Sequence, residues 1–114
     1  MAKSKLPGPL ERRHLIEKEL DPSAAAKIAS AYLEQGRNNE ALDFLAKAGD
    51  DEGLKAVADE AIEIGDAFLL ASVARLTGSE PTRDAWNRCA DAATAKGKER
   101  HAETARRSAA RSEA

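Results

Sequence analysis

Apolar residues recur along this chain at the spacing of amphipathic helices. In residues 22–35 they are Ala25, Ile28, Ala29 and Tyr32. Positions three and four residues apart share one face of a helix, so this segment is predicted to bury that face. The same spacing recurs along the chain and predicts about seven helices, the first over residues 10–19. The segment "DAFLLASVARL" is apolar nearly all round, so we expect its helix to be packed on several sides.

Capping and turn residues separate the predicted helices. Asp21 can cap the N-terminus of a helix whose first position is Pro22. Gly36, Gly65 and Gly97 each follow an apolar segment, where the end of a helix favours a positive φ. Alanine is abundant and β-branched residues are few, which favours closely packed helices over strands. The predicted fold class is all-α.

A residue pattern recurs at fixed distances from these three glycines. A large residue and an alanine stand eight and seven residues before each glycine, at positions 28 and 29, 57 and 58, and 89 and 90. Four residues before the glycines stand Tyr32, Ala61 and Ala93, and five residues after the first and third stand Ala41 and Ala102. The recurrence predicts three helical hairpins, at about residues 22–49, 50–78 and 80–112.

These residues resemble the tetratricopeptide repeat, a helix-turn-helix unit. Its tryptophan, small residue, turn glycine and second-helix alanine correspond here to Trp86, Ala90, Gly97 and Ala102. The resemblance covers about residues 23–110 and implies a right-handed α-α superhelix of about three hairpins. The hairpins also look like those of vesicle-coat and clathrin-type α-solenoids. We expect residues 1–9 to form an extended arm and residues 10–114 a single helical-repeat domain.

The resemblance also implies a binding surface, because the first helix of each hairpin in that family lines a concave groove. The matching positions that we take as partner-binding are Ser30, Leu33, Glu34, Lys55, Asp59, Ile62, Glu63, Asn87, Arg88 and Asp91. This groove would be mostly acidic and would hold a basic or amphipathic peptide or helix. Family members that clamp a C-terminal carboxylate have lysine and asparagine where this chain has Ala26 and Ser30, so that ligand is not expected.

Charge is distributed unevenly along a chain whose net charge is −2. Residues 21–70 contain 11 acids and four bases, whereas residues 96–114 contain six bases and three acids. Clustered cations can bind phosphates, but no aromatic residue in that basic segment could stack on bases, so nucleic acid is not the expected partner. Two alternatives to a protein-interaction module stay open. One is a self-assembling domain whose first helix pairs through Leu15 and Ile16, and the other is a nucleic-acid-associated regulator that uses the basic C-terminal helix.

The residue types needed for catalysis or metal binding do not occur in a suitable arrangement. His14 and Glu17 share a helix face without a second pair of ligands, and Cys89 lies on an apolar stripe, where a thiol packs as a small hydrophobe. We therefore expect a non-enzymatic protein without cofactor or metal. The longest apolar run is too short to span a bilayer, and the single cysteine suits a reducing compartment, so a cytoplasmic location is expected.

Overall fold

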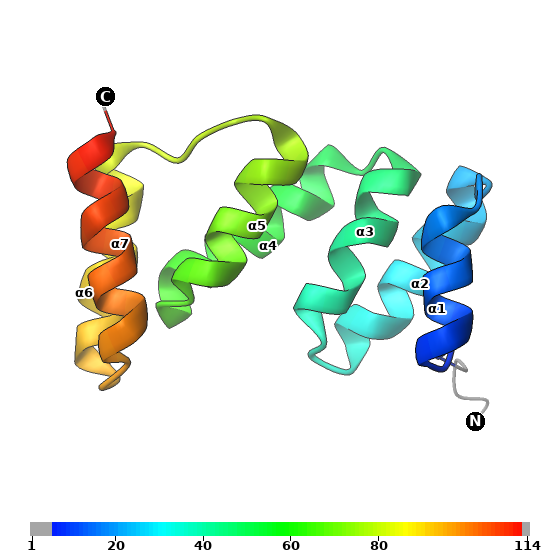
Figure 1. The fold of residues 1–114 in the computed structure, drawn as a ribbon, viewed down its shortest axis with the longest axis horizontal. Helices are drawn as coiled ribbons and strands as arrows, with labels where there is room; N and C mark the ends of the chain where they lie inside the picture. Colours follow the sequence, from blue (N-terminus) through cyan, green and yellow to red (C-terminus); the bar gives the residue numbers. More distant parts are fainter. Residues whose placement is uncertain (1–5, 113–114) are drawn as a thin grey trace. The chain divides into compact units, whose positions relative to one another are not determined.

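The computed structural model describes residues 6–112, and within this range the chain forms helices and no strand (Figure 1). The seven helices of this range are α1 (Pro9–Glu17), α2 (Pro22–Glu34), α3 (Asn38–Ala48), α4 (Asp51–Ile64), α5 (Ala67–Thr77), α6 (Arg83–Ala95) and α7 (Glu99–Arg111). The all-α class predicted from the apolar spacing is confirmed, as is the number of helices. Of the predicted arm, residues 1–5 lie outside the described residues.

Helix α1 begins at Pro9, one residue earlier than predicted, because proline fits the first helical position. It ends at Glu17, two residues earlier than predicted. The backbone of Lys18 is already extended there, although its N–H still donates to the carbonyl of His14 at 3.0 Å. Leu20 therefore lies outside the helix.

Contacts within the chain divide it into two units, Met1–Leu54 and Lys55–Ala114, which are described in turn. Helix α4 belongs to both units, because the division falls within it. The prediction of one domain over residues 10–114 stays a prediction.

The first unit is built on the hairpin of α2 and α3. Its buried side chains are Ala25, Ala29, Ala31 and Tyr32 of α2, and Ala41, Leu42, Phe44 and Leu45 of α3. The alanines allow the two helices to approach closely, and the rings of Tyr32 and Phe44 stack with their centroids 5.9 Å apart. Asp21 caps α2 as predicted, since its carboxylate accepts the N–H groups of Ser23 and Ala24.

Helix α1 packs on this hairpin through an arginine, because none of its residues is buried. The Nη2 of Arg12 donates to the carbonyl of Glu40 at 2.8 Å and lies 3.5 Å from the carboxylate of Asp43. Its Cζ lies 5.6 Å from the ring centroids of both Tyr32 and Phe44. The weak apolar stripe of this helix is thus supplemented by a cation over two aromatic rings.

The second unit is built on the hairpin of α6 and α7, with α5 packed against both. Its buried side chains in these helices are Ala67, Leu69, Leu70, Val73 and Ala74 of α5, Ala85, Trp86, Cys89, Ala90 and Ala93 of α6, and Ala102, Ala105 and Ala109 of α7. We expected α5 to be packed on several sides. It contacts α6 and α7, but the expectation is wrong for one face, where Phe68 and Leu76 are 51% and 38% exposed.

One turn geometry recurs after α2, α4 and α6. Gly36, Gly65 and Gly97 have φ of 71°, 76° and 73°. The N–H that follows each glycine donates to the carbonyl four residues before that glycine, in Tyr32, Ala61 or Ala93, at 2.8–3.0 Å. This is the Schellman motif, which closes the end of a helix. It explains why the predicted pattern recurs at a fixed distance from these glycines.

Candidate functional site

The ten residues predicted to bind a partner lie on α2, α4 and α6, the first helices of the predicted hairpins. Eight are exposed: Ser30, Glu34, Lys55, Asp59, Glu63, Asn87, Arg88 and Asp91. Leu33 is partly buried, and Ile62 is only 9% exposed, so Ile62 contributes mainly to packing. The α2 residues belong to the first unit, whereas the α4 and α6 residues belong to the second.

The α4 residues form an acidic stripe. The acids of this stripe are Asp59 and Glu63. They follow Lys55 at intervals of four residues, so all three side chains lie on one face of the helix. Within described residues 55–112, no cation pairs with Asp59 or Glu63. Within that range, both carboxylates are open to a cationic partner.

The α6 residues carry a mixed charge. Arg88 Nε lies 3.3 Å from the carboxylate of Asp84 one turn earlier, so this pair adds no net charge. Asn87 lines a cavity of 300 Å³ together with Arg83 and side chains of α7. The groove was predicted to be mostly acidic, and in the second unit α4 has that character but α6 does not.

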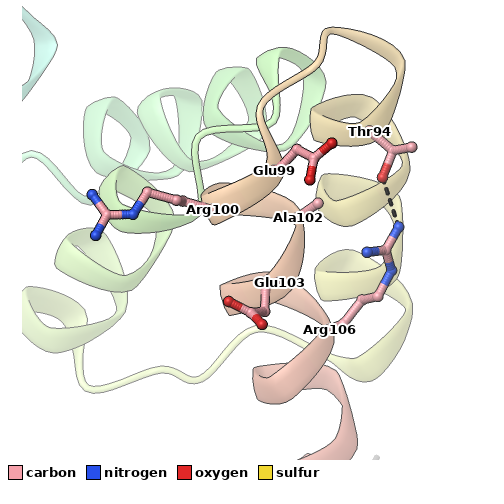
Figure 2. A pocket seen from close by; sticks show the side chains of 6 residues that line it. All are labelled: Thr94, Glu99, Arg100, Ala102, Glu103 and Arg106. Atoms are coloured by element: carbon pink, nitrogen blue, oxygen red, sulfur yellow. Dashed lines mark hydrogen bonds between the residues drawn. The ribbon is translucent and has the colours of Figure 1, made fainter.

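A second cavity, of 410 Å³, lies on the α6–α7 hairpin (Figure 2). Figure 2 shows Glu99 and Glu103 between Arg100 and Arg106, with the side chain of Arg100 extending away from Thr94. Arg106 Nη2 donates to Thr94 Oγ1 at 2.6 Å. Two acids and two bases offset each other here, so this cavity has no preference for a ligand of one charge.

A third cavity, of 600 Å³, lies among α5, α6, α7 and the segment that joins α5 to α6. Its apolar lining is Ala71, Ala74, Pro81 and Trp86, and its polar lining is Glu80, Thr82, Ser108, Arg111 and Ser112. Ala71 and Ala74 lie more than 30 residues before Ser108 and Arg111, so the helical pattern of the sequence gave no sign of this cavity.

His101 has a structural role that the sequence did not indicate. Its Nδ1 accepts the N–H of Ala67 at 3.1 Å and lies 3.5 Å from Oδ1 of Asp66, which caps α5 by accepting the N–H of Leu69. Lys98, the residue directly before α7, donates from its Nζ to the carbonyl of Ile64 at 2.9 Å. Helix α7 thereby satisfies backbone groups at the end of α4 and the start of α5. The partners lie 34 residues from Lys98 and His101, beyond the reach of local sequence patterns.

Cys89 lies in the core of the second unit with an exposed fraction of 0%. Its Sγ lies 3.9 Å from the carbonyl oxygen of Ala61. Burial, assisted by the charge of Asp66, raises the pKa of the thiol to about 11. The thiol is therefore protonated at neutral pH, and its predicted place in the core is confirmed.

The described residues contain no group of three or more side chains that could hold a metal ion, and none of their helices is long and apolar enough to cross a membrane. No protein-family model, curated protein or solved structure matches this chain. The structure thus defines its class as an all-α protein with helical hairpins. The resemblance to the tetratricopeptide repeat stays a prediction.

Proposed function

We propose that this protein is a non-enzymatic interaction module that binds a basic or amphipathic peptide or helix of a partner protein. The observation that carries the proposal is the exposed acidic stripe of α4, where Asp59 and Glu63 have no cationic partner within described residues 55–112. Ser30 and Glu34 present a comparable exposed polar face on α2. Helical-repeat proteins bind extended or helical partners through such faces.

The binding strength must come from several contacts together. A single exposed ion pair contributes less than about 1 kcal/mol, so a partner that paired only with Asp59 and Glu63 would bind weakly. A partner with an apolar side next to its basic side gains from burial of that apolar side as well. This is why an amphipathic partner fits the surface better than a purely basic one.

Affinity capture from the native cell extract tests the proposal. The Asp59→Lys, Glu63→Lys double variant is expected to lose the partners that the wild-type chain retains, because it places cations where carboxylates attract them. Glu60→Lys with Glu80→Lys is the matched control, since it reverses two other exposed acids and is expected to keep the partners. Retention of the same partners by the Asp59→Lys, Glu63→Lys variant would refute the proposal.

The proposal includes the predicted architecture and location. Stacking of the hairpins in a right-handed, tetratricopeptide-like superhelix would bring the α2, α4 and α6 faces onto one groove. The recurrent turn at Gly36, Gly65 and Gly97 supports it, because the same turn then joins the two helices of each repeat. A cytoplasmic location agrees with a lone protonated thiol at Cys89. An experimental structure of the whole chain tests the stacking.

Self-assembly is a second candidate, and the surface of α1 favours it. Leu10 is 73% exposed and borders a surface hollow with His14 and Leu15. Two copies could bury these side chains against each other. Light scattering is expected to show a concentration-dependent dimer that the Leu10→Glu variant loses. The Arg13→Glu variant reverses an exposed charge of α1 outside the hollow and serves as the control. A wild-type chain that stays monomeric would exclude self-assembly.

A further inference from the structure

The arginines of α7 lie along one flank of that helix. Arg100, Arg107 and Arg111 are exposed and are spaced by seven and four residues, with Thr104 between the first two. From Arg100 to Arg111 the stripe runs about 16 Å along the axis at the rise of an α-helix. Arg111 Nη2 donates to Ser108 Oγ at 3.3 Å, and Arg107 lies 3.4 Å from Glu103 in an exposed pair that solvent screens.

Helix α5 brings an aromatic ring to this flank. The Phe68 ring lies 4.5 Å from the imidazole of His101, at an angle of 59°, and the phenyl side chain is half exposed. His101 directly follows Arg100, so the ring stands at the end of the arginine stripe. His101 also anchors the start of α5 through the N–H of Ala67, which fixes the place of Phe68 on the surface.

The C-terminal end of the stripe also lies near α5. Ser108 and Arg111 of α7 line the same cavity as Ala71 and Ala74 of α5. The two helices are in contact, and they converge at their N-terminal ends in Figure 1. The two ends of the stripe, Arg100 next to His101 and Arg111 in the shared cavity, therefore adjoin α5, and Phe68 is the exposed ring at the Arg100 end. We call Phe68, Arg100, His101, Arg107 and Arg111 the α5–α7 face.

We propose that the α5–α7 face binds single-stranded nucleic acid. Guanidinium groups pair with phosphates, and an exposed ring provides a stacking surface for a base, which is the combination that proteins use to bind single strands without strict sequence preference. The basic segment of the sequence lacks an aromatic residue, which argued against nucleic acid. The fold supplies the ring of Phe68 from α5, which lies 33 residues before His101 in the sequence.

An acidic peptide is the other partner that could pair with these arginines. Such a peptide could use any apolar side chain at position 68 as a contact, whereas a base stacks only on a flat ring. The ring of Phe68 is half exposed beside a second flat ring, His101, which favours stacking. The α5–α7 face shares no residue with the acidic stripe of α4, so this inference does not depend on the proposed peptide binding.

Fluorescence anisotropy with a labelled oligothymidylate of about 12 nucleotides tests the inference. Binding is expected at about 50 mM salt. Three phosphate contacts predict a slope of about −2 in a plot of log K against log salt concentration, which is about a 16-fold loss between 50 and 200 mM salt. The triple variant Arg100→Gln, Arg107→Gln, Arg111→Gln is expected to abolish the slope. Arg13→Gln, Arg88→Gln, Arg106→Gln removes three exposed arginines elsewhere and is expected to keep it.

Substitutions of Phe68 separate stacking from simple apolar contact. Phe68→Leu keeps an apolar side chain and removes the ring, so the affinity is expected to fall about 5- to 100-fold. Phe68→Trp keeps a flat ring and is expected to bind within about threefold of the wild type. Circular dichroism checks that each variant is folded, which the exposure of Phe68 favours.

Three results would overturn the inference. The first is no binding of the oligonucleotide at about 50 mM salt. The second is equal binding by the Phe68→Leu variant. The third is equal binding of a glutamate peptide with the same number of charges, which would show that the face attracts acidic chains of any kind. The Asp59→Lys, Glu63→Lys variant is expected to bind the oligonucleotide no more weakly than the wild type, which distinguishes this site from the proposed peptide-binding face.

Discussion

At the scale of single residues, Gly65 has two constraints, and the other turn glycines share only the first. Its φ is +76°, which favours glycine, and a Cβ at this position would lie 2.4 Å from the backbone nitrogen of Ala93. Gly97 has a similar φ of +73° but nothing within 4 Å of such a Cβ. The turn after α4 is therefore packed directly against the backbone of α6.

Replacing these two glycines separates conformational strain from steric exclusion. Gly97→Ala is expected to lower the free energy of unfolding by about 1–2 kcal/mol, the cost of a left-handed alanine. Gly65→Ala is expected to lower it by at least about 1 kcal/mol more, because the backbone of α6 must move. Urea denaturation measures both values, and equal losses would show that Ala93 does not restrict this position.

Glu40 links stability to pH. Its carboxylate pairs with the guanidinium of Arg37, and this hydrogen bond holds the pKa of Glu40 below its usual value of 4.5. A carboxyl group whose pKa is lowered by folding stabilises the fold above its unfolded pKa, and it loses this effect as the pH falls through the lowered value.

The wild-type protein is therefore expected to be more stable than the Glu40→Gln variant at pH 7. The difference should shrink as the pH falls from 7 to about 3, because the carboxyl group gains a proton first in the unfolded state and only at the lowered pKa in the folded state. Urea unfolding at the two pH values measures the change. The Glu17→Gln variant is a control, because Glu17 lies in a more exposed pair with Arg13. A difference at pH 7 that persists undiminished at pH 3 would contradict the pairing.

At the scale of elements, α1 is attached mainly through a polar side chain. Arg12 is 23% exposed, whereas the neighbouring Arg13 is 77% exposed and reaches only Glu17 within its own helix. The hydrogen bond to Glu40 and the two aromatic rings favour the bound position of Arg12. Its buried Nε has no hydrogen-bond partner within the described residues, which lowers the net contribution of Arg12 to stability.

The Arg12→Ala variant is expected to lose about 1–2 kcal/mol of stability, from one charged hydrogen bond and the cation–π contacts less the cost of the unpaired Nε. Arg13→Ala should change the stability by less than about 0.5 kcal/mol, because an exposed pair within one helix contributes little. Hydrogen exchange of α1 amides should increase in the first variant only. Unchanged exchange in Arg12→Ala would mean that other contacts hold the helix.

At the scale of the whole molecule, α4 is the element that both units share, because the division at residue 54 falls inside one continuous helix. Separating the units would break the hydrogen bonds of this helix. We therefore expect one cooperative unfolding transition, in agreement with the single domain predicted from the chain length.

Two probes test this cooperativity. Trp86, the only tryptophan, is 3% exposed in the second unit, so its fluorescence reports unfolding of that unit. Far-ultraviolet circular dichroism reports all helices. The two transitions in urea are expected to coincide in the wild type and to shift together in Gly65→Ala. Fluorescence and circular dichroism midpoints that differ would show that the two units unfold independently.

Sequence patterns predicted the elements well because the forces that position them act over a few residues. The cap at Asp21 and the turns at Gly36 and Gly97 depend on hydrogen bonds between neighbours within six positions. Boundaries were less accurate where the local signal is weak, as at the end of α1. The exposed side of α5 was missed because hydrophobicity alone does not show which neighbours a helix has.

The sequence by itself determined the helical class, the turns and most of the buried face of α2, since apolar spacing and caps are encoded locally. Only the tertiary structure showed that His101 and Lys98 hold the start of α5 and the end of α4. It alone placed Phe68 beside His101 of α7 and Arg12 over two aromatic rings. These contacts join residues about 20 to 34 positions apart, and such pairs meet only when the helices pack.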